Sequence, residues 1–211
     1  MFDVAQGHES VVGLVAWIDM SARDCLDRLQ KYLDLPGAER LVGIRDGAQG
    51  RTDTGWLSSQ IVVENVRKLA SDSLTSVSYT HLRAHDLLVD PPHLPASVKL
   101  VRAVPDNIFI LDHIGKPNIA KGEITDWAKV IKELAKSENV FCKISGMVTE
   151  ADWKSWEKKE FTPYFETVLE AFGVDRIMYG SDWPVCKLAA SYAQVAELAE
   201  FLVAGLSTEE K

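Results

Sequence analysis

Short apolar runs alternate with amphipathic segments along most of this chain. Near-continuous apolar runs are typical of strands buried on both faces of a parallel sheet, and they occur at 11–18, 41–44, 86–89, 108–111, 140–144 and 176–179. Segments with helical spacing of apolar residues lie between and after them, at about 21–33, 58–70, 95–104, 126–136, 162–172 and 192–203. Strands that alternate with helices predict βα units and a parallel sheet.

Two architectures are compatible with this pattern, an open doubly wound sheet and a (β/α)8 barrel. No Gly-x-Gly-x-x-Gly follows any expected strand, which disfavours a dinucleotide-binding open sheet. Ionisable residues instead stand at or just past many strands, where barrel enzymes place their chemistry: Asp19, Arg45, Asp90, His113, Lys143 and Asp182. A closed barrel needs eight strands and about 250 residues. The pattern therefore favours an α/β fold, a TIM-like (β/α)8 barrel with about six of the eight βα units.

One stretch, Ser76–His85, has neither helical nor strand periodicity of useful length. It is interpreted as a surface loop or as a junction foreign to the rest of the sequence. His81 and His85 stand four residues apart, but His-Leu-Arg-Ala-His lacks the glutamate of a His-Glu-x-x-His zinc motif. We expect no metal ligation by these two histidines.

Asp182 and His113 are the main candidates for chemistry. Asp182 follows a buried strand and precedes Trp183, so it could take a proton from water or simply cap the next turn. His113 follows another strand, and in a barrel the two strand ends converge on one pocket. Such a pair could activate water, bind a metal or polarise a carbonyl.

Lys143 stands within the apolar strand Val140–Ile144, where an unpaired ammonium is costly. It could anchor a polar or anionic substrate, or form a structural ion pair. Ser145 is not in a Gly-x-Ser-x-Gly elbow, so a serine nucleophile has little support.

Composition narrows the class of protein. The 211 residues include 23 Lys and Arg against 31 Asp and Glu, a formal net charge of −8, and no basic cluster suits a phosphate backbone. No apolar run is long enough to span a membrane, and the first residues show no signal-peptide pattern. The three cysteines, at 25, 142 and 186, form no disulfide or zinc pattern. We expect a cytoplasmic protein with no nucleic-acid or membrane partner.

Three strings occur in order: Leu-Asp-His-Ile-Gly-Lys-Pro (111–117), Cys-Lys-Ile-Ser-Gly (142–146) and Tyr-Gly-Ser-Asp-Trp-Pro-Val (179–185). Together they resemble the amidohydrolase-related (amidohydrolase 2) family, in its branch of sugar lactonases such as L-fuconolactonase and L-rhamnonolactonase, together with 2-pyrone-4,6-dicarboxylate lactonase. The resemblance covers nearly the whole chain. It implies a distorted TIM barrel and a hydrolase that opens a lactone or related bond with base-activated water.

The resemblance also implies roles for single residues. Asp182 corresponds to the aspartate that activates water, and His113 to the histidine of the family's Asp-His motif. Either His113 or a bound cation could stabilise the oxyanion. Lys143 matches the lysine of a strand that lines the same pocket. Arg45 and Trp183 are expected to contact the small-molecule substrate that the resemblance implies, a lactone or sugar acid, and no residue is assigned to a metal.

The chain also departs from the family pattern. Family members begin with a strand carrying His-x-His, which binds metal in many superfamily relatives, whereas the histidines here are 8, 81, 85, 93 and 113. On this comparison, residues 1–211 form a single barrel domain truncated at both ends, with 76–85 as an insertion. The sequence does not determine a cofactor. The candidate is one divalent metal ion, such as zinc, in the complete protein. A metal-dependent decarboxylase of the same superfamily and a catalytically inactive barrel fragment are the alternatives.

Overall fold

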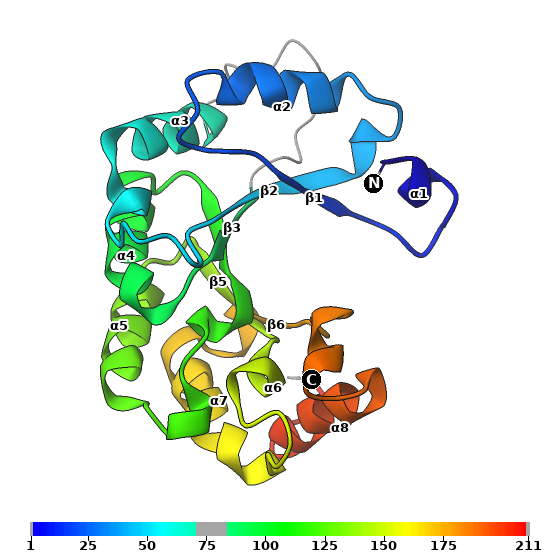
Figure 1. The fold of residues 1–211 in the computed structure, drawn as a ribbon, viewed down its shortest axis with the longest axis vertical. Helices are drawn as coiled ribbons and strands as arrows, with labels where there is room; N and C mark the ends of the chain where they lie inside the picture. The colour runs from blue at the N-terminus through cyan, green and yellow to red at the C-terminus, as the bar shows by residue number, and fades with distance from the viewer. Residues whose placement is uncertain (1, 71–83, 210–211) are drawn as a thin grey trace.

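A parallel sheet organises the molecule (Figure 1). The computed structural model describes residues 2–70 and 84–209. In them, six strands lie in the order in which they occur along the chain, every neighbouring pair being parallel. The strands are β1 (Leu14–Trp17), β2 (Leu41–Gly47), β3 (Ala84–Leu88), β4 (Ile108–Leu111), β5 (Val140–Ile144) and β6 (Ile177–Tyr179). This is the α/β fold expected, with β1 and β6 as the two edges of an incomplete TIM-like barrel.

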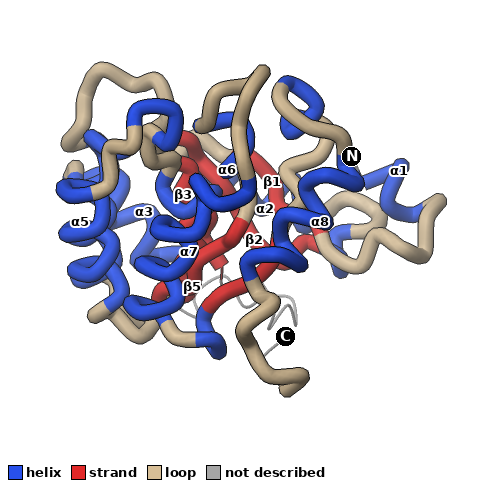
Figure 2. The backbone as a smooth tube through the Cα atoms, turned by 90° about the horizontal axis from the view of Figure 1, so that it is seen from below, coloured by secondary structure: helices blue, strands red, loops and turns tan. Residues whose placement is uncertain are grey.

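Helices lie before, between and after the strands, and a row of them covers one face of the sheet. They are α1 (Phe2–Gln6), α2 (Cys25–Leu33), α3 (Gln60–Ala70), α4 (Leu94–Ala103), α5 (Thr125–Ala135), α6 (Met147–Glu150), α7 (Lys158–Phe172) and α8 (Tyr192–Leu202). Helices α3, α4 and α5 form a row along the same side of the strands, and the end-on view of Figure 2 shows α3, α5 and α7 on that side. None of the described helices combines the length and the apolar character needed to cross a bilayer.

The two faces of the sheet differ in burial because only one of them is covered by helices. Alternate strand residues on the covered face are fully buried and form the centre of the core, among them Ala16, Ile44, Leu87, Phe109 and Cys142. The other face is partly exposed and carries Arg45 and Lys143. In a barrel this second face is the interior, so charged side chains on it point toward the substrate space.

The structure corrects the expectation for part of the segment 76–85. Residues 76–83, including His81, lie outside the described residues. Ala84 and His85, however, belong to β3 and pair in register with β2 and β4, so a loop that extends to His85 is wrong. The His85 ring is 1% exposed and lies 5.9 Å from the Phe109 ring, centre to centre. This histidine interrupts the apolar pattern of the sequence without interrupting the strand.

Candidate active site

The candidate residues come from the carboxyl ends of successive strands. Arg45 is in β2, His113 follows β4, Lys143 is in β5 and Asp182 follows β6. Since the strands are parallel, their carboxyl ends all lie on the same side of the sheet, along one line across the strands. The structure therefore brings together four of the five residues that the sequence analysis selected.

Two cations and two carboxylates form a network on the inner face of the sheet. Arg45 Nη2 lies 2.7 Å from Asp86 Oδ2 and 2.9 Å from Asp112 Oδ2. Lys143 Nζ lies 2.6 Å from Asp112 Oδ1 and 3.4 Å from Asp86 Oδ2. Both carboxylate side chains are fully buried, so each depends on these cations for its charge to be tolerated. Burial lowers the pKa of Arg45, but Asp112 and Asp86 outweigh this and raise it above its usual value.

His113 and Asp182 form a second, adjoining unit. His113 Nε2 lies 3.7 Å from Asp182 Oδ1, and both side chains are largely buried. Burial lowers the pKa of His113 to about 4, and the nearby Asp182 carboxylate only partly opposes this shift. The imidazole is therefore neutral near pH 7, and it can donate one hydrogen bond and accept another.

The strand end after β5 holds the imidazole in place. Ser145 Oγ lies 2.8 Å from His113 Nδ1. The next residue, Gly146, has φ +61, and a Cβ at this position would lie 2.7 Å from Cγ and Nδ1 of His113. Gly180 packs closely against Ser145 in turn, because a Cβ there would lie 3.0 Å from the Ser145 Cβ. Ser145 and Gly146, the two residues after β5, thus fix the position of the His113 ring.

The backbone around the site adopts left-handed conformations at residues other than glycine. In the described chain these are His113, Ile114, Lys116 and Asp182, with φ of 53, 49, 52 and 54°. Such a conformation costs about 1–2 kcal/mol per residue, and it concentrates at functional sites in proteins. Local contacts hold these residues: the Ile114 carbonyl accepts from Trp127 Nε1 at 2.9 Å, and Lys116 pairs with Glu150. Two of these four residues, His113 and Asp182, are the ones selected for chemistry.

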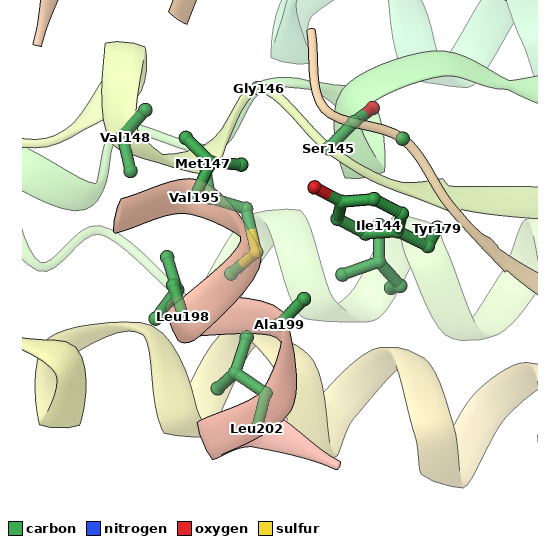
Figure 3. Close-up of a pocket in the computed structure, with 11 residues that line it drawn as sticks. Ile144, Ser145, Gly146, Met147, Val148, Tyr179, Val195, Leu198, Ala199 and Leu202 are labelled. Carbon is green, nitrogen blue, oxygen red and sulfur yellow. The ribbon is translucent and has the colours of Figure 1, made fainter. Parts of the chain in front are cut away.

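An apolar pocket lies next to Ser145 and Gly146, between the ends of β5 and β6 and helix α8 (Figure 3). Its wall on the α8 side consists of Val195, Leu198, Ala199 and Leu202. The Ser145 hydroxyl points away from these aliphatic side chains. The polar side chains among its lining residues are Ser145 and Tyr179, so the pocket offers packing space rather than acid–base chemistry.

Some expected residues stand apart from the site. Trp183 is 63% exposed. It belongs to the region of the site because it follows Asp182 directly in the sequence. Asp19 accepts hydrogen bonds from Ser21, two residues later, and stabilises a turn. Asp90 accepts from the amide of Gly50 and so links the loop after β3 to the loop after β2.

Sequence reasoning missed three members of the site. Neither Asp86, inside a strand, nor Asp112, beside His113, has a role predicted from sequence, and the sequence offers Ser145 only as a poorly supported nucleophile. A signal existed for the two aspartates, because a buried carboxylate requires a cation. Arg45 in β2 stands beside Asp86 in β3, and Lys143 is in β5, next to the strand that Asp112 follows. The contact of Ser145 with His113 had no such signal.

The described residues do not fit a metal centre. Within residues 2–70 and 84–209, no three His, Cys, Asp or Glu side chains are grouped as a metal ion would require. Cys25, Cys142 and Cys186 are each buried and free.

Comparisons with known proteins agree with the residue pattern. The sequence profile of the family described as Amidohydrolase matches residues 2–211. The chain is 32% identical to L-fucono-1,5-lactonase of Burkholderia ambifaria over 192 residues, which cover 91% of this chain and 62% of that protein. It is 31% identical to L-fucono-1,5-lactonase of Burkholderia multivorans, over 95% of this chain and 67% of the relative.

A solved structure is similar throughout the chain. It is the crystal structure of an amidohydrolase from Burkholderia multivorans with bound zinc. The TM-score is 0.86 at 30% identity, and the match covers 99% of this chain and 72% of that one. The chain thus spans about two thirds of the length of the curated relatives it matches.

Proposed function

Because this chain belongs to the amidohydrolase family, we propose that it hydrolyses a sugar lactone with water activated by Asp182. The observation that carries the proposal is the His113–Asp182 pair, whose Nε2 and Oδ1 atoms lie 3.7 Å apart at the ends of β4 and β6. The two Burkholderia relatives named L-fucono-1,5-lactonase support the choice of bond.

The mechanism follows from the protonation states. Asp182 accepts a proton from a water molecule while the water oxygen bonds to the lactone carbonyl carbon. The carbonyl oxygen becomes an oxyanion, and neutral His113 donates to it from Nε2. When the tetrahedral intermediate collapses, the bond from carbon to the ring oxygen breaks, and the proton held by Asp182 passes to that oxygen. The product is the open hydroxy acid.

The charge network supports an uncharged substrate. Arg45 and Lys143 are matched by Asp86 and Asp112, so the four groups carry no net charge. We propose that the two cations donate hydrogen bonds to substrate hydroxyl groups, and that neither neutralises a substrate carboxylate. Trp183, which is 63% exposed and follows Asp182 in the sequence, is proposed to contact the substrate.

The decarboxylase alternative is not favoured, because the two most similar relatives described above are named as lactonases. No step of the proposed reaction is assigned to a metal, since the described residues do not fit one. The inactive-fragment alternative is an outcome of the experiment below.

The test is hydrolysis of L-fucono-1,5-lactone by the purified protein, followed by acid release and corrected for spontaneous opening. Asp182→Asn keeps the shape of the side chain and removes the proton acceptor, so kcat should fall by roughly 10²–10⁴-fold. The matched control is Asp175→Asn, the same change at an exposed residue just before β6, which should leave the rate unchanged. Equal rates for the unmodified protein and Asp182→Asn would overturn the proposal.

A further inference from the structure

We propose that Ser145 is a positioning residue: its hydroxyl donates to Nδ1 of His113 and thereby fixes the imidazole proton on Nε2. The catalytic consequence rests on the proposed function, whereas the hydrogen-bond arrangement does not. Sequence reasoning had considered Ser145 only as a nucleophile, and the structure shows its hydroxyl directed at the histidine instead.

The short contact between Ser145 Oγ and His113 Nδ1, 2.8 Å, allows two arrangements. In the first the serine donates to a bare Nδ1, and in the second a protonated Nδ1 donates to the serine. Ser145 is only 4% exposed, and within residues 2–70 and 84–209 its hydroxyl has no other hydrogen-bond partner. The second arrangement would therefore leave the buried hydroxyl proton unsatisfied, which is costly.

The contact at the opposite edge of the ring, at Nε2, independently favours the same tautomer. His113 Nε2 faces Asp182 Oδ1 at 3.7 Å. A bare nitrogen lone pair facing a carboxylate is repelled, whereas an N–H is attracted. The carboxylate on one edge and the hydroxyl on the other therefore favour the same tautomer, with the proton on Nε2 and Nδ1 as acceptor.

The chain end after β5 makes this arrangement rigid. Gly146 lies against the His113 ring, while Ser145 contacts its Nδ1 edge, and Gly180 packs against Ser145. The two residues that orient the ring are consecutive and continue directly from a paired strand. The ring therefore has little freedom to turn over and exchange the roles of its nitrogens.

This tautomer places an N–H donor beside Asp182, where the oxyanion would form. In the other tautomer Nε2 would be an acceptor and could not stabilise negative charge on the carbonyl oxygen. Ser145 does not touch the reacting atoms in this scheme. It acts by keeping His113 a donor on the side of the substrate.

The test is ¹⁵N NMR of the His113 imidazole in the full chain near neutral pH, without substrate. We expect a protonated Nε2 and a bare Nδ1 in the unmodified protein, and a mixture of both tautomers in Ser145→Ala. The matched control is Ser97→Ala, which removes another fully buried serine hydroxyl, one that bonds to the His93 carbonyl just before α4. This control should leave the His113 signals unchanged.

A protonated Nδ1 in the unmodified protein, or an unchanged tautomer in Ser145→Ala, would overturn the proposal. If Ser145→Ala does not fold, Ser145→Cys keeps the side-chain volume with a weaker donor, and the same shift toward a mixture is expected. In the lactone assay, Ser145→Ala should lower kcat by about 10-fold and leave KM unchanged, less than loss of the donor itself would. Absence of lactone hydrolysis would refute the proposed function but would not alter the NMR result.

Discussion

Gly146 lies directly against the imidazole of His113, so close that a Cβ at this position would be 2.7 Å from two ring atoms. Non-bonded carbon atoms pack at about 3.5–4.0 Å. Either the ring or the strand end would have to move if any other residue stood there. The glycine is therefore needed for the position of the histidine as well as for its own backbone conformation.

Gly146→Ala should disturb the site more than the fold. The matched control is Gly122→Ala, because Gly122 also has a positive φ, +64, but a Cβ there would meet no atom within 4 Å. Both variants should lose about 1 kcal/mol of stability from the left-handed backbone. Only Gly146→Ala should lower kcat, by roughly 10²-fold, because it displaces His113. Urea denaturation and the lactone assay measure the two effects, and equal kcat values would contradict the expectation.

His113→Asn should lower kcat by about 10²–10³-fold, the usual cost of removing an oxyanion donor. Substrate binding in the ground state should change little, so KM is expected to stay near its original value. The measurement is steady-state hydrolysis of the lactone. A variant that keeps the full rate would show that His113 does not stabilise the reacting oxygen.

Lys143→Met tests the buried charge network. The change leaves Asp86 and Asp112 with Arg45 as their remaining cation, and breaking a buried pair typically costs about 3–5 kcal/mol. Lys132→Met is the control, because Lys132 pairs with Glu170 at 2.7 Å on an exposed helix surface. Exposed pairs contribute about 0–1 kcal/mol. Equal losses in urea denaturation would mean that the network contributes no more than a surface pair.

His85→Leu should stabilise the protein. Both ring nitrogens of His85 are buried, and among residues 2–70 and 84–209 neither has a hydrogen-bond partner. An unsatisfied buried polar group costs about 1–3 kcal/mol. Leucine fills similar space with no polar atom. We expect a higher urea midpoint for His85→Leu near neutral pH, and a lower midpoint would show that the ring has a favourable contact.

The same variant should weaken the dependence of stability on pH. Burial lowers the pKa of His85 from 6.5 to about 4. Between these values the unfolded chain binds a proton that the folded chain does not, so the free energy of unfolding falls as the pH falls. Each such histidine contributes up to ~1.4 kcal/mol per pH unit. His113 has the same shift in its pKa, so His85→Leu should remove part of the slope and leave the rest. A slope identical in both proteins would contradict the shifted pKa.

The sheet could be predicted from sequence because each strand is an apolar run that needs no partner to be recognised. Boundaries were less certain where a polar residue is buried. The apolar run begins at Asp86, whereas β3 begins at Ala84 and includes His85, whose polar side chain is buried. Helix α7 begins at Lys158 rather than at Thr162, because Glu157 and Glu160 form a capping box that satisfies its first amides.

The site could be predicted only as far as strand topology determines it. Parallel strands require His113 and Asp182 to lie at one edge, and they do. The contact between His113 and Ser145 depends instead on the left-handed backbone at His113, which turns the ring back toward β5. A pattern of residue types contains no information about that turn.

Strand order that follows chain order has a consequence for how the protein folds. Each strand pairs with its immediate neighbours in sequence, and β1 and β6 do not pair with each other in the described part of the chain. Every strand pair in the described sheet therefore joins neighbouring units of the chain. The loops that must close are short, so the entropic cost of loop closure is low. The sheet can extend from any adjacent pair of strands, one βα unit at a time. The residues of the site come from β2 through the end of β6, so they would assemble only when that growth is complete.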